Sequence, residues 1–179
     1  MKRAALPLAA AVFLAGCGAS EEPAQRTAAA TEAPAQQTAA ATRGPAPKVA
    51  DFPVLASKDC VAVVQFYLEA IGGREWAQAA LVWNDPAIDA ARLEAVYAGY
   101  KEPKVEWTEP FVEGAAGSSF CTVTGKLSDA GNPATPLIEG TLLLRRVNDV
   151  PGATPDQLRW TLRSSTFVER LERSDGGKP

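Results

Sequence analysis

The sequence predicts an α+β domain in which helices come first and an antiparallel sheet of about four strands packs over them. Apolar residues recur at three- and four-residue spacing between residues 60 and 98, which is the period of buried helices. Beyond residue 104 the spacing changes toward alternation, which is the period of strands with one buried face. Helices followed by a run of strands are typical of α+β domains.

Three helices are expected, over residues 61–71, 76–83 and 87–98. Asp59 precedes the first helix as an N-cap, and two glycines at 72–73 end it. The second helix carries tryptophan and alanine on one stripe, which favours burial of that stripe. Asp85 is the expected N-cap of the third helix, with a proline at its first position.

Four strands follow, around residues 105–111, 119–127, 137–147 and 158–163. Pro110 indicates that the first strand lies at an edge or contains a bend, because proline cannot donate to a sheet. The last segment alternates most clearly. It is expected to turn three side chains inward, Leu158, Trp160 and Leu162, and three outward, Arg159, Thr161 and Arg163.

The order of these elements, together with the segment Val64–Ala80, resembles the nuclear-transport-factor-2-like superfamily. In that family a first helix ends in a tight turn before a second helix rich in aromatic residues and alanine. The likeness covers most of residues 60–168 and implies a cone, in which a strongly curved antiparallel sheet wraps the helices and often leaves a pocket at its open end. Family members include isomerases, ligand-binding proteins and interaction modules, so the fold does not decide the function.

The N-terminus has the layout of a secretory signal. Lys2 and Arg3 precede an apolar run over residues 4–14, which is too short to span a membrane. The segment Leu14-Ala15-Gly16-Cys17 resembles the lipobox of bacterial lipoproteins. This resemblance implies removal of residues 1–16, lipid on Cys17 and a stable membrane anchor, with Gly18 favouring the outer membrane in a diderm bacterium. The alternative is an ordinary signal peptide with a chance cysteine.

Residues 17–50 are expected to be a disordered tether rich in alanine, threonine and proline. They contain a tandem repeat of eleven residues, Ala24–Pro34 followed by Ala35–Pro45, and almost no branched aliphatic residue. An eleven-residue period is also that of a right-handed coiled coil, but the repeat lacks large apolar residues for a seam. Residues 51–170 are then the single globular domain, and residues 171–179 are expected to be a flexible tail.

Composition excludes several classes of function. The chain has no histidine, which excludes histidine-based triads, bases and metal sites. It has 18 basic and 21 acidic residues, and removal of Lys2 and Arg3 makes the balance more acidic, so nucleic acid is not an expected partner. The tyrosines and glutamates of the domain, namely Tyr67, Glu69, Tyr97, Tyr100, Glu106, Glu109 and Glu139, are better explained by packing and solvated faces than by catalysis. No catalytic, metal or cofactor site is expected.

Cys60 and Cys121 remain once Cys17 is assigned to lipid. A pair of cysteines in an exported protein predicts a disulfide, which closes a loop of about 60 residues. The alternative is a reactive thiol in a nucleophilic site, for which no histidine is present as an activating base.

The candidate ligand or partner site consists of Tyr100, Trp107 and Phe111, at the expected mouth of the cone. The four tryptophans of the domain also suit core positions, in phase with neighbouring apolar residues. The function expected first is a non-enzymatic envelope lipoprotein facing the periplasm, which binds an envelope protein or a second copy of itself. The alternatives are a pocket for a small apolar molecule and, last, a lyase or isomerase of the same superfamily.

Overall fold

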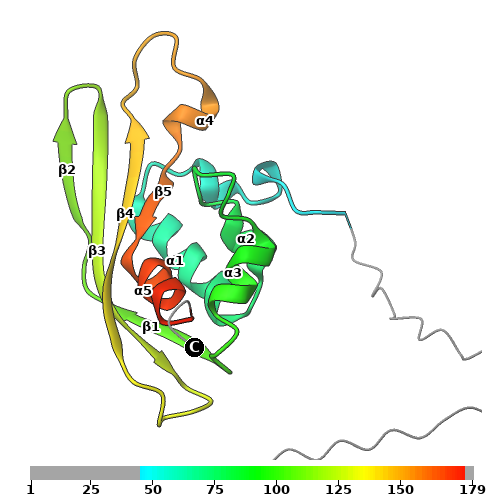
Figure 1. Cartoon of the computed structure of the whole chain (residues 1–179). Helices are drawn as coiled ribbons and strands as arrows, with labels where there is room; N and C mark the ends of the chain where they lie inside the picture. Colours follow the sequence, from blue (N-terminus) through cyan, green and yellow to red (C-terminus); the bar gives the residue numbers. More distant parts are fainter. Residues whose placement is uncertain (1–44, 176–179) are drawn as a thin grey trace, which may run out of the picture. The chain divides into compact units, whose positions relative to one another are not determined.

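The computed structural model describes residues 45–175 as a mixed α+β domain (Figure 1). The predicted signal peptide, Cys17 and most of the predicted tether lie outside the described residues. The elements follow one another in the order η1 (Val49–Asp51), η2 (Pro53–Ala56), α1 (Cys60–Gly72), α2 (Trp76–Ala80), α3 (Ala90–Val96), β1 (Pro103–Trp107), β2 (Phe111–Ala115), β3 (Ser118–Asp129), β4 (Ile138–Val147), α4 (Pro155–Leu158), β5 (Thr161–Ser165) and α5 (Thr166–Asp175).

Helix α1 forms where local signals predict it. The Asp59 carboxylate accepts the backbone N–H of Val61 at 2.9 Å, which satisfies one of the free donors at the start of the helix. At the other end the Gly73 N–H donates to Glu69 O at 2.8 Å. Apolar side chains cover most of the helix, and six of its residues are buried, namely Cys60, Val63, Val64, Tyr67, Ala70 and Ile71. Helix α1 is therefore the centre of the core.

Helices α2 and α3 are shorter than the sequence predicts. Helix α2 ends at Ala80, because the chain around Trp83 leaves the helix and pairs with β5. There Leu162 N–H donates to Val82 O at 2.8 Å, and Asn84 N–H donates to Leu162 O at 3.1 Å. Helix α3 begins at Ala90 with Asp89 as its N-cap, whereas the predicted cap, Asp85, accepts the N–H of Ala87 in the preceding turn.

Five strands of the described residues form one antiparallel sheet, rather than about four (Figure 1). The order is β1-β3-β4-β5, and β2 also pairs with β3. The predicted strand 105–111 is in fact two strands, since the chain leaves the sheet after Trp107 and returns at Phe111, directly after Pro110. Proline has no N–H to donate, which accounts for a break at this point.

The C-terminal part of the domain corrects three further predictions. The last strand begins at Thr161, and Leu158 belongs to the short helix α4 instead. Trp160 and Leu162 are buried as predicted, but so is Thr161, whose hydroxyl donates to Arg145 O at 3.2 Å beside a shift in register between β4 and β5. Residues 171–175, predicted as tail, belong to α5, in which Leu171 is buried.

Two glycines allow the sheet to curve around the helices. Gly125 of β3 lies directly opposite Gly140 of β4. A Cβ atom on Gly125 would lie 2.7 Å from Glu106 O, and one on Gly140 would lie 2.7 Å from the ring of Phe167. At these positions the backbones of β3 and β4 come closer to β1 and α5 than any other residue would permit.

The predicted disulfide between Cys60 and Cys121 is confirmed. It links the first residue of α1 to the fourth residue of β3, with 6.5 Å between the two Cα atoms. Both cysteines are buried, so the bond lies within the core. Among the described residues, none of the helices is both long and apolar enough to cross a membrane.

Candidate functional site

The space between the sheet and the helices is filled by side chains. Tyr67, Tyr97 and Phe167 are the largest fully buried residues, and each has an exposed fraction of only 1%. The rings of Trp76 and Tyr97 stack with centroids 5.7 Å apart, and Tyr100 packs edge-on against Tyr97 at 6.3 Å. These aromatic rings are part of the hydrophobic core.

Tyr67 and Tyr97 are buried phenols. Burial raises the pKa of Tyr67 and, together with the neighbouring hydroxyl of Tyr67, that of Tyr97, so both phenols stay neutral at physiological pH. The hydroxyl of Tyr67 and the indole N–H of Trp83 find no hydrogen-bond partner among the described residues. The hydroxyl of Tyr67 and the indole N–H of Trp83 are therefore buried donors that could bond to a group entering this part of the core.

Asp129 is the one buried carboxylate of the described residues, and its oxygens are already engaged. Oδ2 accepts the N–H of Lys101 at 3.0 Å, and Oδ1 accepts those of Glu102 at 2.8 Å and Gly131 at 3.0 Å. Burial alone would raise the pKa of Asp129, but these three backbone donors outweigh it and hold the pKa below its usual value. Asp129 therefore fixes the chain just before β1 and just after β3. Because its oxygens already accept these bonds, it is unsuited to act as a base.

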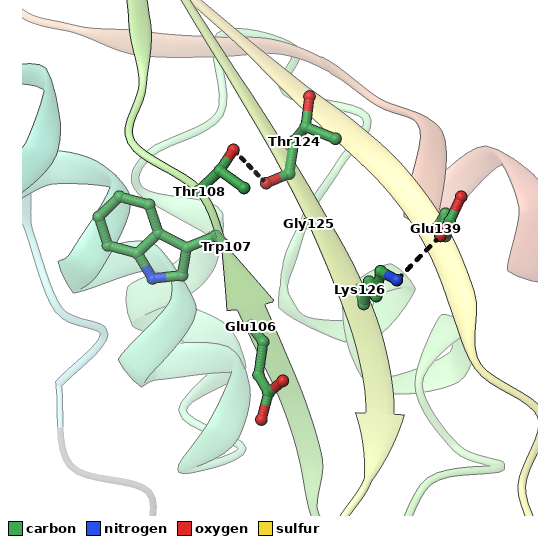
Figure 2. A pocket seen from close by; sticks show the side chains of 7 residues that line it. All are labelled: Glu106, Trp107, Thr108, Thr124, Gly125, Lys126 and Glu139. Carbon is green, nitrogen blue, oxygen red and sulfur yellow. Dashed lines mark hydrogen bonds and ion pairs between the residues drawn. The ribbon is translucent and has the colours of Figure 1, made fainter.

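The structure does not bring the three predicted site residues into one pocket. Tyr100 is buried beside Tyr97, and Phe111 is 65% exposed at the start of β2. Of the three, Trp107 alone lines the depression that Figure 2 shows, which has a volume of about 310 Å³. Its lining consists of Glu106, Trp107, Thr108, Thr124, Gly125, Lys126 and Glu139.

This depression is shallow, and its charges are paired. Lys126 and Glu139 form an ion pair at 3.2 Å, visible in Figure 2, and Glu106 pairs with Lys104 at the same distance. Their side chains are 60% to 71% exposed, so water screens them and they exert little pull on a ligand. The volume is at the lower limit of small-molecule sites, roughly 300–1,000 Å³.

Trp107 also borders a second depression, of about 450 Å³, on the side of α1. Gln65, Leu68 and Glu69 of α1 face the first residues of β1 across it. The half-buried Trp107 ring thus separates two open hollows. Among the described residues, no three side chains of the histidine, cysteine, aspartate and glutamate types come together in a group suited to a metal ion.

The most exposed part of the sheet is β2. All five of its residues are exposed, and two of them are large and apolar, Phe111 at 65% and Val112 at 53%. Phe111 lies opposite Thr122 on the face away from the core, whereas Val112 lies opposite the buried Cys121. Sequence reasoning selected Phe111 as a pocket residue and missed Val112. The exposed apolar residue directly after Pro110 was the available signal for an edge strand.

Comparisons with known proteins give weak similarities. No protein-family model matches the chain, and no curated protein matches its sequence. Among solved structures, Bd1075 of Bdellovibrio bacteriovorus aligns at a TM-score of 0.43 and 9% identity, covering 60% of this chain. The chain spans only 38% of that protein.

A second solved structure comes from Streptomyces avermitilis and is described as a candidate dehydratase of the nuclear-transport-factor-2-like family. It aligns at a TM-score of 0.42 and 15% identity, covering 63% of this chain and 94% of that one. Similarities at these scores assign neither a fold family nor a function. The architecture of the chain is therefore defined by its own order of helices and strands and by the pairing within its sheet, not by these similarities.

Proposed function

We propose that the chain is a lipid-anchored protein of the cell envelope whose α+β domain acts, without catalysis, by binding another protein through the surface around β2. The observation that carries the proposal is the contrast between the filled interior and the exposed edge. Tyr67 and Tyr97 occupy the interior, while β2 exposes Phe111 and Val112 to solvent. Phe111 and Val112 lie on opposite faces of this strand, and exposed apolar side chains on an edge strand favour an interaction site there.

The proposed anchor rests on the segment Leu14-Ala15-Gly16-Cys17 and on its context in the sequence. The disulfide between Cys60 and Cys121 agrees with an oxidising compartment, because such bonds are rare in the cytosol. The stretch from Cys17 to about residue 50 would act as a spacer between the lipid and the domain. We also propose that the domain is a nuclear-transport-factor-2-like cone, on the strength of its helices-then-sheet order and its curved antiparallel sheet.

A second candidate function is the binding of a small apolar molecule beside Trp107. The observation that favours it is the position of this ring between two hollows. A ligand of this kind binds the folded state and raises the thermal midpoint. A ligand-induced rise in the thermal midpoint that is lost in Trp107→Ala, and kept in Phe111→Ser, would favour the pocket beside Trp107 over the β2 surface.

The anchor is tested by changing Cys17 to serine in the full chain. Without a thiol to receive the lipid, the protein should move from the membrane fraction to the soluble fraction of the envelope. Cell fractionation and immunoblotting measure this distribution, with Cys60→Ala/Cys121→Ala as the control that leaves Cys17 intact and should remain membrane-bound. Retention of the Cys17→Ser protein in the membrane fraction would exclude the proposed anchor.

A further inference from the structure

We propose that the hollow between the N-terminal turns, η1 and η2, and helix α4 binds a small apolar molecule that ends in a carboxylate, such as octanoate. This hollow, called the α4 hollow below, has a volume of about 290 Å³. It shares no lining residue with the two depressions beside Trp107, and none of its residues belongs to β2. The inference therefore goes beyond the function proposed above.

Two segments that are far apart in the sequence form the apolar wall of the α4 hollow. The N-terminal turns contribute Val49 and Ala56, and helix α4 contributes Pro155 and Leu158. Val49 and Leu158 are half-buried, so each keeps apolar surface that a ligand can cover. The volume is close to the lower limit of small-molecule sites, roughly 300 Å³, which favours a ligand of few atoms.

The charged end of the α4 hollow is built around Arg159. Its side chain is only 13% exposed. Its Nη1 donates to Leu81 O at 3.0 Å, which holds the guanidinium against the end of α2. Its Nε donates to Asp156 Oδ1 at 3.3 Å. Neither bond uses Nη2, so this nitrogen can serve a further acceptor.

Asp156 is a weak partner for this guanidinium. Its side chain is highly exposed and reaches Arg159 through one oxygen, and such a pair contributes little to stability. Arginine binds a carboxylate best when two parallel N–H groups meet its two oxygens. The edge formed by Nε and Nη2 offers this fork once Asp156 turns into solvent. A ligand carboxylate can therefore replace Asp156 and form the stronger pair.

The charges that line the α4 hollow favour an anion. Two cations line it, Lys58 and Arg159, with one carboxylate, Asp156. Lys58 pairs with Asp149 outside the hollow, and the same carboxylate lies 3.7 Å from a guanidinium nitrogen of Arg146. Because Asp149 is shared by two cations, it neutralises Lys58 only in part.

Two other carboxylates of the N-terminal segment are engaged elsewhere. Asp51 accepts the backbone N–H of Lys48 at 2.8 Å, and Asp59 accepts that of Val61 at 2.9 Å. Neither lines the α4 hollow. These two carboxylates therefore stabilise the starts of η1 and α1 and do not compete for Arg159.

The inference is tested by titrating octanoate into the full chain that carries Cys17→Ser, so that no acyl chain attached at Cys17 can compete. Calorimetry measures the affinity. The thermal midpoint is a second readout, because a ligand of the folded state raises it. Octanol has the same chain without the charge and should bind about tenfold more weakly, since it cannot form the charged pair.

Two variants test the role of the guanidinium. Arg159→Lys keeps the charge but removes the fork, and it should weaken octanoate binding about tenfold. Asp156→Asn removes the internal carboxylate that competes for Nε, and it should tighten octanoate binding. A gain in affinity cannot result from misfolding, so this variant keeps the test valid if Arg159→Lys is unstable. The matched control is Arg163→Gln, at an exposed position of β5, which should bind octanoate like wild type.

Three results would overturn the inference. They are a wild-type chain that does not bind octanoate up to millimolar concentration, octanol binding as tight as octanoate binding, and an affinity for octanoate that neither Arg159→Lys nor Asp156→Asn changes. Loss of octanoate binding in Trp107→Ala, with binding kept in Arg159→Lys, would also overturn it and would place the ligand beside Trp107. The β2 surface is unchanged in all these variants, so the proposed function stands or fails separately.

Discussion

Asp129 shows how one side chain sets the geometry of the sheet edge. Its carboxylate accepts three backbone N–H groups, from Lys101, Glu102 and Gly131, and so fixes the chain before β1 and after β3. These bonds favour the ionised form, which is why the pKa of Asp129 lies below its ordinary value. Stability from this residue is fully present above the ordinary pKa of 3.8 and is lost as the pH falls through the lower pKa of the folded state.

Asp129→Asn should destabilise the domain at neutral pH and flatten the fall in its stability below about pH 4. The amide can replace one oxygen but turns an N–H₂ group toward a backbone donor, so at least one of the three bonds is lost. Urea denaturation between neutral and acidic pH measures both effects. Asp156→Asn, whose side chain is 84% exposed, is the control and should change little. Parallel stability curves for Asp129→Asn and wild type would contradict this role.

At the scale of elements, the opposed glycines in β3 and β4 determine how closely the sheet approaches its neighbours. Gly125 lets the carbonyl of Glu106 approach β3, and Gly140 lets the ring of Phe167 lie against β4. Phe167 is buried on the first turn of α5, so the position of that helix depends on the absence of a side chain at Gly140. Strand curvature and helix packing are thus linked at this pair.

Gly125→Ala and Gly140→Ala should each lower the free energy of unfolding by about 1–3 kcal/mol, because the added methyl group overlaps backbone or a buried ring. Gly99→Ala is the matched control. A Cβ atom at Gly99 meets nothing within 4 Å, and its replacement should stay within about 0.5 kcal/mol of wild type. Chemical denaturation of the three variants measures these values, and equal stability of all three would contradict the proposed link.

Local signals predicted helix α1 and the existence of a helices-then-sheet domain, since caps and periodicity are encoded in neighbouring residues. The bounds of the other elements depend on pairing between residues far apart in the sequence. The second helix is shortened because residues around Trp83 bond with Leu162, about eighty positions later in the chain. The sequence did not predict helix α5, because its apolar stripe is short and consists of Phe167 and Leu171. These two residues indicate a helix only when they are seen to pack against β4. The sequence indicated Phe111 as a site residue. Its place on an exposed edge strand became clear only from the order of the strands.

At the scale of the whole molecule, the disulfide joins the two halves of the fold. Cys60 begins the first helix and Cys121 lies in the central strand, 61 positions away. Crosslinking residues so far apart restricts the unfolded chain more than the folded one. The bond therefore holds the helical layer to the sheet.

Cys60→Ala/Cys121→Ala should lower the free energy of unfolding by about 4 kcal/mol on the chain-entropy model. The measurement is the denaturation midpoint of the double variant compared with that of the oxidised wild type. Reduced wild type should approach the double variant. A double variant as stable as the oxidised wild type would show that the bond does not hold the fold together.

The claim that this domain works through the surface around β2 is tested most directly by photo-crosslinking in intact cells. A photoreactive amino acid replaces Phe111 in the full chain, and the control replaces Arg163, an exposed residue of β5. We expect a discrete protein adduct from position 111, with this chain or with another envelope protein, and none from position 163. An absence of adducts at position 111, or equal adducts at both positions, would contradict it.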